Sequence, residues 1–139
     1  MAAADEEWHE VRLADFGLAF GYPRRTPSDG AVEFDDVRLH ARSADGKEVY
    51  FELSRHLDVT ADEMYERERD FIVGRYGAEV TPLTGTTIDS LPAQEYSASW
   101  GDTERRFVVA EHGPWLYRVV YDPRSPLNVA VRDSVRIES

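Results

Sequence analysis

The sequence predicts an α+β fold: an α/β/α sandwich with a central antiparallel sheet, one long helix at about residues 61–76 and one short C-terminal helix at about residues 126–133. Three observations indicate this class. Apolar residues alternate with period two in segments that can pair as hairpins. One segment between the hairpins repeats its apolar residues at helical spacing instead. A later segment, residues 115–121, is apolar at both parities, which is typical of a strand covered on both faces.

Length and composition indicate a single acidic domain over residues 1–139, in which residues 1–7 are expected to be disordered. Hydrophobic residues make up 42% of the chain, which is enough to build a core. The formal net charge of −11 repels phosphate backbones, so we expect no nucleic-acid partner. No apolar run approaches the ~20 residues of a membrane-spanning helix, so we expect no membrane insertion.

The first residues carry neither the basic region nor the apolar region of a signal peptide, so the sequence as it stands predicts a cytoplasmic protein. The mature domain of an exported protein is the alternative, if a signal peptide was removed. The absence of cysteine does not distinguish these compartments, because a chain without cysteine tolerates either redox state.

Two strands are expected near the start of the chain. The segment WHEVRLA, residues 8–14, is expected at a sheet edge with Trp8 as its anchor. The next segment, FGLAFG, has two glycines four residues apart. Phe20 and Tyr22 favour a strand there over the strand–glycine–helix arrangement of a dinucleotide site.

The first predicted hairpin joins residues 36–42 to residues 48–54, which both alternate with period two. A three-residue loop at Ala44-Asp45-Gly46 would connect them, with glycine in the left-handed position. Opposite charges facing each other on the outer face would contribute a few tenths to about 1 kcal/mol per pair. The register predicts Leu39 opposite Phe51 on the inner face, and Arg38 opposite Glu52 and Arg42 opposite Glu48 on the outer face.

The predicted helix at residues 61–76 has local signals at both ends. Thr60 and Glu63 form a capping box, in which each side chain satisfies a free backbone amide. Gly77 provides the left-handed C-cap. The charged face is interpreted as solvated. The apolar stripe consists of Ala61, Met64, Tyr65, Phe71, Ile72 and Tyr76.

A second hairpin is predicted to turn at Gly101-Asp102, where glycine takes the first position of a type II′ turn. This register places Tyr96 opposite Phe107 on one face and Ser97 opposite Arg106 on the other.

The segment after the second hairpin predicts a buried strand and a final helix. Residues 115–121 are apolar throughout apart from Arg118, and Asp122-Pro123 ends that strand. Ser125 and Pro126 indicate a helix start, as N-cap and first-turn residue. One helix cannot cover both faces of the sheet, so the helix at residues 126–133 is expected on the face that the first helix leaves open. Residues 135–137 are expected to close the chain as an extended segment.

The segment FGLAFGYPRR resembles the Gly-Phe-Ser-Phe-x-Tyr-Pro opening of PsbP-like proteins. The order of hairpin, long helix, the segment SLPAQEYSASW, two more strands and a short final helix is similar as well. A glycine often precedes the Pro-Ala pair in that family, whereas Leu91 stands before Pro92-Ala93 in this chain. The matching residues of the opening segment are Gly17, Phe20, Tyr22 and Pro23.

The resemblance implies an antiparallel sheet sandwiched between helices. Proteins similar in this way include an extrinsic subunit of photosystem II, a Ran-binding nuclear import factor, bacterial lipoproteins and chaperones of secreted toxins. They share the binding of macromolecules without catalysis. The resemblance therefore implies a binding or accessory role and no enzymatic activity.

The sequence has no motif that indicates catalysis, a metal or a cofactor. There is no cysteine nucleophile or thiolate ligand, and the acidic cluster at residues 29–36 lacks the D-x-D-x-D-G pattern of a calcium loop. We expect no catalytic residue, no cofactor and no metal site. The four histidines, none at the spacing of a metal-binding motif, are His9, His40, His56 and His112.

The best candidate for a protein-binding site is the tip of the second hairpin. Trp100 stands at the tip, and Arg105 and Arg106 follow the turn on an otherwise acidic chain. Tryptophan and arginine dominate the binding energy of many protein interfaces, and such a tip would be locally positive and partly apolar. The alternative is that Trp100 packs over the core beside Tyr96.

Two functional hypotheses follow. The first is a non-enzymatic binding or accessory module that engages another protein, as a monomer or weak homodimer. The second is a small ligand-binding domain or enzyme with a pocket between sheet and helix. A deep cleft with converging polar groups would favour the second hypothesis, and a broad aromatic patch would favour the first.

Overall fold

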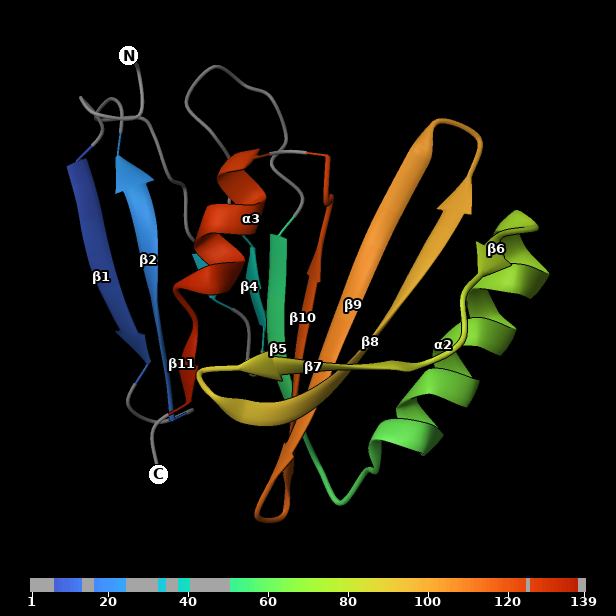
Figure 1. Cartoon of the computed structure of the whole chain (residues 1–139), viewed down its shortest axis with the longest axis horizontal. Helices are drawn as coiled ribbons and strands as arrows, with labels where there is room; N and C mark the ends of the chain where they lie inside the picture. Colours follow the sequence, from blue (N-terminus) through green and yellow to red (C-terminus); the bar gives the residue numbers. More distant parts are fainter. Residues whose placement is uncertain are drawn as a thin grey trace.

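The structure is a computed structural model that describes residues 7–13, 17–24, 33–34, 38–40, 51–124 and 126–137. These residues form two sheets and two helices (Figure 1). Within the described residues, no helix is long and apolar enough to cross a membrane.

Eight strands of the described chain form the main sheet, in the order β3-β4-β5-β10-β9-β8-β6, with β7 also paired to β8. Every pairing in it is antiparallel. The strands are β3 (Glu33–Phe34), β4 (Arg38–His40), β5 (Phe51–Leu57), β6 (Glu79–Val80), β7 (Thr84–Ile88), β8 (Leu91–Trp100), β9 (Thr103–His112) and β10 (Trp115–Tyr121).

A smaller antiparallel sheet has the order β1-β2-β11 within the described residues. Its strands are β1 (Glu7–Leu13), β2 (Leu18–Arg24) and β11 (Arg136–Ile137), so β2 lies between a strand from the start of the sequence and one from its end (Figure 1). Strand β1 lies at its edge, as expected for the segment that contains Trp8. Glu7 already belongs to β1, while residues 1–6 of the segment expected to be disordered lie outside the described residues.

The two helices cover opposite faces of the main sheet. Helix α2 (Ala61–Tyr76) packs against β6, β8 and β9, and helix α3 (Pro126–Asp133) packs against β2 and β10 (Figure 1). Strand β10 shows this arrangement residue by residue. Val119 shares a buried cluster with Val131 of α3, whereas Leu116 shares another with Met64 of α2. The predicted sandwich, with an interior strand buried on both faces, is confirmed.

Both helices have the bounds that their local signals predicted. The Thr60 side chain accepts from the Glu63 backbone N–H, and the Glu63 side chain accepts from the Thr60 N–H, which completes the capping box. Gly77 ends α2 with φ of 65°, a left-handed conformation that favours glycine. Short-range chemistry thus fixes where α2 begins and ends.

The second hairpin has the predicted register. Tyr96 lies opposite Phe107, Ser97 lies opposite Arg106, and Gly101 takes φ of 55° in the turn. Strand β9 is covered on both faces, because Val108 and Val109 are both buried although they point to opposite sides.

The pairing of β4 with β5 corrects the predicted register of the first hairpin. The pairs Arg38–Glu52 and Leu39–Phe51 are wrong by two residues. A shift by two leaves each side chain on the same face, because the side-chain period of a strand is two. The observed pairs are Arg38–Ser54, Leu39–Leu53 and His40–Glu52, and the remaining predicted pair, Arg42–Glu48, lies outside the described residues.

The predicted pair failed because it assumed that the Glu52 side chain is exposed to solvent, whereas it is buried. Its side chain is only 7% exposed and accepts a 2.6 Å hydrogen bond from Arg118 Nη1 of β10. Strand β5 lies between β4 and β10, so both of its edges are paired. The prediction assigned Glu52 to a surface charge pair, whereas its partner comes from the other neighbouring strand.

Candidate functional site

A hollow of about 350 Å³ lies between α2 and the face of the sheet formed by β8, β9 and β10. It is lined by apolar side chains and by a small set of polar side chains. The apolar lining consists of Phe71, Ile72, Tyr76, Trp100, Phe107 and Val120, and the polar lining consists of Glu68, Thr103, Arg105 and Arg118.

Local geometry explains why these side chains converge. Glu68, Ile72 and Tyr76 are four residues apart on α2 and therefore share one face of the helix. Trp100 pairs with Thr103 across the turn, so both point to the same side of the hairpin. Period two in β9 then places Arg105 on that side as well.

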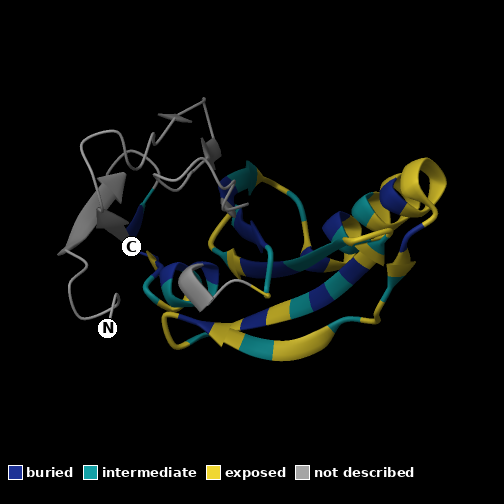
Figure 2. Cartoon of the chain, turned by 90° about the horizontal axis from the view of Figure 1, so that it is seen from above, coloured by how far each residue is buried: buried dark blue, intermediate teal, exposed yellow. Residues whose placement is uncertain are grey.

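Three aromatic rings form the rim of the hollow, and we call Phe71, Tyr76 and Trp100 the aromatic rim. The Tyr76 and Trp100 rings are stacked, with centroids 4.8 Å apart and an interplanar angle of 10°. Phe71 meets Tyr76 edge-on at 6.4 Å. Phe71 is 58% exposed and Tyr76 is 46% exposed, and Figure 2 shows exposed residues along much of α2. Large apolar side chains with this exposure mark an interaction surface when they are contiguous.

Beside the rim, Arg118 joins β10 to β5 and α2 through a buried ion cluster. Its Nη1 donates to Glu52 Oε1 at 2.6 Å, and its Nε lies 2.5 Å from Glu68 Oε1. Burial opposes the positive charge, but the Glu68 and Glu52 carboxylates outweigh it and raise the pKa of Arg118 above its ordinary value. Arg118 is therefore a permanent cation held by two carboxylates.

Tyr96 lies under the same cluster. Its ring stacks on Phe107 at 4.6 Å and meets Tyr65 of α2 edge-on at 4.9 Å. Its hydroxyl is buried, with no hydrogen-bond partner among the described residues. Burial and then the Glu68 charge raise the pKa of Tyr96 above its ordinary value, although Arg118 opposes the shift. The hydroxyl accordingly remains protonated.

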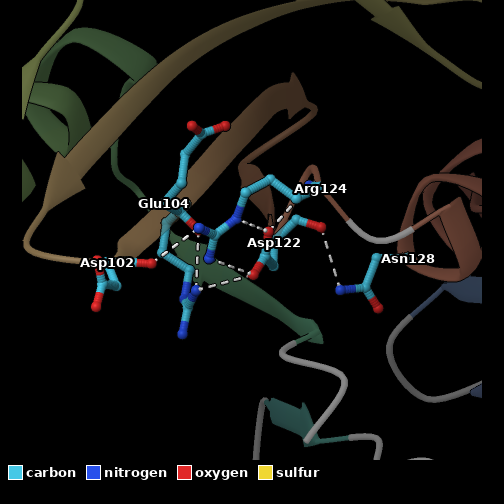
Figure 3. Close-up of polar contacts among 6 residues, drawn as sticks. Asp102, Glu104, Asp122, Arg124 and Asn128 are labelled. Carbon is cyan, nitrogen blue, oxygen red and sulfur yellow. Dashed lines mark hydrogen bonds and ion pairs between the residues drawn. The ribbon is translucent and has the colours of Figure 1, made fainter.

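Arg105, which lines the hollow, is also part of a polar network. Its Nη1 donates to the Glu104 carbonyl at 2.9 Å and lies 3.7 Å from Asp122 Oδ2. Figure 3 shows Arg124 between Asp102 and Asp122: Arg124 Nη1 donates to the Asp102 carbonyl at 2.8 Å, and Nη2 donates to Asp122 Oδ2 at 3.0 Å. The network ties the hairpin tip to the loop after β10.

The Asp122 carboxylate is the centre of this network. Hydrogen bonds from the Arg124 side chain are the largest cause that lowers the pKa of Asp122 below its ordinary value, with the Arg124 backbone N–H and the charge of Arg105 adding to the effect. The Asp122 carbonyl accepts from Asn128 Nδ2 at 3.2 Å, which fixes the start of α3 to the same loop (Figure 3). Arg105 is thus already paired inside the protein.

The structure brings two of the three residues of the candidate protein-binding site together. Trp100 and Arg105 both line the hollow. Arg106 lies opposite Ser97 and points to the other face of the hairpin. Trp100 also packs against the buried cluster that contains Tyr96, so the hollow and the core share this side chain.

Phe71 and Tyr76 belong to the site but were assigned to the buried stripe of the helix from their spacing. Helical spacing places them on or near the inward face of α2, beside Ile72, which is buried. How completely the sheet covers each side chain of the helix depends on long-range packing, which the spacing of residues along the helix does not predict. The aromatic residues in the stripe were the available signal that this part of the helix could form a binding site.

The described residues also contain a serine–histidine contact. Ser54 Oγ lies 3.0 Å from His56 Nε2 on β5. Ser54 is completely buried, so a substrate cannot reach its oxygen in this conformation. No group of three or more His, Cys, Asp or Glu side chains in the described ranges is arranged to hold a metal ion.

Comparison with known proteins supports the fold. No family model matches the sequence, and no curated protein matches it. Among solved structures, cyanobacterial PsbP (CyanoP) from Synechocystis sp. PCC 6803 is similar, with a TM-score of 0.62, 13% sequence identity, and coverage of 94% of this chain and 92% of that chain. The chain has the PsbP-like fold that the resemblance of its sequence implied.

Proposed function

We propose that this chain is a non-enzymatic binding or accessory module that engages another protein through the hollow between α2 and the β8–β9 hairpin. The observation that carries this proposal is the aromatic rim, in which Phe71 and Tyr76 are about half exposed beside Trp100. Aromatic side chains around a concavity are the usual anchors of protein interfaces. The PsbP-like fold supports an accessory role by analogy of fold alone.

The polar side chains of the hollow favour binding over catalysis. Arg118 forms ion pairs with Glu52 and Glu68, and Arg105 forms an ion pair with Asp122. A general acid or base needs a pKa near the working pH, and a guanidinium with a raised pKa does not meet that need. The charged side chains of the hollow therefore bind one another and hold the neighbouring strands and α2 together, rather than serve as an acid or a base.

The alternative hypothesis has its own observation. A volume of about 350 Å³ lies at the lower end of the roughly 300–1,000 Å³ of small-molecule sites. The hollow lies between sheet and helix, where a small ligand-binding domain or enzyme would have its pocket. The two functions differ in whether the rim contributes: a protein partner covers Phe71 and Tyr76, whereas a small ligand leaves most of the rim exposed.

The test compares two double variants as baits in lysate from the native host. Tyr76→Ala with Trp100→Ala removes the stacked pair of the rim. Val73→Ala with Arg106→Ala is the matched control, because Val73 is an exposed apolar residue of α2 outside the hollow and Arg106 lies on the other hairpin face. Truncation of an interface anchor costs about 2 kcal/mol or more of binding free energy, so the first bait should lose its partner and the control should keep it.

Thermal unfolding of both baits separates binding from folding. The rim variant must still unfold cooperatively for its loss of capture to count, and if it does not, Phe71→Ala alone replaces it because Phe71 is the most exposed rim residue. Equal capture by a folded rim variant and the control would refute the proposed function. Turnover of a small substrate that persists in the rim variant would favour the alternative.

A further inference from the structure

We propose that the occupant of the hollow is an uncharged, proline-rich segment of the partner protein, bound in the extended polyproline II conformation against the aromatic rim. This inference rests on the proposed function, because it names the chemistry of the partner at the same hollow. It follows from the charges that line the hollow, from the hydrogen-bond donors beside them, and from the rings of the rim.

The charged side chains that line the hollow already have partners of opposite sign. Arg118 pairs with Glu68, which also lines the hollow, and with Glu52, and Arg105 pairs with Asp122. A charged occupant would have to compete with these contacts, and removing one partner from a buried ion pair is strongly unfavourable. The lining therefore attracts neither a cation nor an anion strongly.

The charges around the hollow act against both signs. Arg75 is exposed, and its guanidinium lies 5.8 Å from the centroid of the Tyr76 ring, so a cationic segment would meet a like charge at the rim. The net charge of −11 of the whole molecule repels an anionic segment during encounter. An uncharged segment avoids both penalties and is therefore the best match for this site.

Three residues that line the hollow have hydrogen-bond donors with no acceptor among the described residues. The donors are the indole N–H of Trp100 and the hydroxyl groups of Tyr76 and Thr103. The indole nitrogen donates and cannot accept. A partner that covers these groups has to supply acceptors, because a donor that is buried without a partner is costly.

A polyproline II segment supplies acceptors of this kind. Its carbonyl groups make no hydrogen bonds within the segment, and proline has no backbone N–H that would need an acceptor in return. An α-helix is less suitable, because its carbonyls accept from its own amides. A β-strand binds best along a sheet edge, whereas the hollow lies between α2 and a sheet face.

The aromatic rim suits proline rings. The Tyr76 and Trp100 rings are nearly parallel, and Phe71 and Tyr76 are about half exposed, so the rim presents aromatic surface to a partner. Grooves lined by aromatic side chains bind proline-rich segments in several kinds of domain, because such a segment is extended before it binds and loses little entropy. The remaining apolar lining, Ile72, Phe107 and Val120, adds surface for an uncharged segment.

The experiment is an NMR titration of the isotope-labelled full chain with an uncharged proline-rich peptide that is acetylated and amidated at its ends. The control peptide has the same length, with alanine in place of every proline. We expect the proline-rich peptide to bind at least about tenfold more tightly. The chain has three tryptophans, and the indole N–H signal of Trp100, assigned with Trp100→Phe, should be the one that shifts. Equal affinities of the two peptides would overturn the inference.

Conservative variants test the donors. Tyr76→Phe and Thr103→Val remove a hydroxyl group and keep the shape of the side chain, and each should weaken binding of the proline-rich peptide several-fold. Tyr65→Phe is the matched control, because the Tyr65 hydroxyl donates to the Thr81 carbonyl at 3.0 Å and does not line the hollow. We expect this control to leave the affinity unchanged. Equal effects of Tyr76→Phe and Tyr65→Phe would contradict the assigned role of the donors.

Added charge tests the choice of an uncharged occupant. Lysines or glutamates are placed at both ends of the proline-rich peptide, and at physiological salt neither addition should raise its affinity as much as tenfold. A tenfold gain corresponds to about 1.4 kcal/mol and would show that the hollow selects a charged segment.

The outcome separates this inference from the proposed function. If capture from lysate depends on Tyr76 and Trp100 but the proline-rich peptide binds no better than the alanine peptide, the proline-rich occupant is wrong and the binding module stands. If the proline-rich peptide binds and the Trp100 signal does not shift, it binds elsewhere and the inference is again wrong. If capture is also independent of the rim, both proposals fall.

Discussion

Arg118 is the charged residue around which the α2 side of the sheet is organised. It interrupts an otherwise apolar strand, and the structure gives it Glu52 from β5 and Glu68 from α2 as partners. The sequence marks Arg118 as an exception but does not identify its partners, because the two carboxylates lie far from it in the chain. Glu52 was assigned to a surface pair for that reason.

Replacement of Arg118 by leucine tests the cluster. The change leaves two carboxylates buried without their cation, and breaking a buried pair by removing one partner costs roughly 3–5 kcal/mol. We expect urea unfolding at neutral pH to show a loss of that size. The control is Arg69→Leu, which removes an exposed ion pair with Asp70 and should change stability by no more than about 0.5 kcal/mol.

A result in which Arg118→Leu and Arg69→Leu cost the same would contradict this account of Arg118. Adding Glu52→Gln and Glu68→Gln to Arg118→Leu should recover part of the loss, since the uncompensated charges are then removed. Without such recovery, the loss would have to be attributed to packing rather than to the ion cluster.

At the scale of the element, the helices were predictable and the first hairpin was not. Helix α2 begins at a capping box and ends at Gly77, and both signals lie within a few residues of the bounds they set. The β8–β9 register was likewise set by its turn at Gly101. The register of β4 against β5 was predicted from a loop and from opposite charges. The residue that binds Glu52 is instead Arg118 of β10, 66 residues further along the sequence, and local signals do not indicate it.

Gly74 in α2 and Gly77, the C-cap residue after it, provide a paired test of the helix end. Gly74 is an exposed interior residue with nothing within 4 Å of an added Cβ, so Gly74→Ala should stabilise the protein by about 0.5–1 kcal/mol. Gly77 has the same open space but φ of 65°, so Gly77→Ala should destabilise it by about 1–2 kcal/mol. Chemical denaturation of the two variants measures both changes. Changes of the same sign would show that the C-cap conformation of Gly77 does not determine where α2 ends.

At the scale of the molecule, the sandwich was predicted from the pattern of one strand, β10. Residues 115–121 are apolar on both parities, which requires cover on both faces, and the chain offers two helical segments to supply it. The structure places α2 and α3 on those opposite faces. Burial pattern is carried by every residue of a strand, so it survives errors in the register of any one pair.

The candidate site was less predictable than the fold because it depends on how residues far apart in the sequence pack together. Trp100 and Arg105 were identified from residue type and turn position, and both line the hollow. Arg106 was grouped with them although its parity places it on the other face. Phe71 and Tyr76 fitted a buried stripe, whereas the structure leaves both about half exposed beside the hollow.

Site-specific photo-crosslinking in the native host tests the proposed binding surface most directly. A photo-reactive amino acid replaces Phe71, which is 58% exposed at the rim, or Val73, which is 44% exposed on the same helix but outside the hollow. A module that binds its partner through the hollow gives a discrete protein adduct from position 71, reduced by Trp100→Ala, and little or none from position 73. Adducts of equal yield from the two positions, or an adduct from position 73 alone, would contradict the assignment of the hollow as the binding surface.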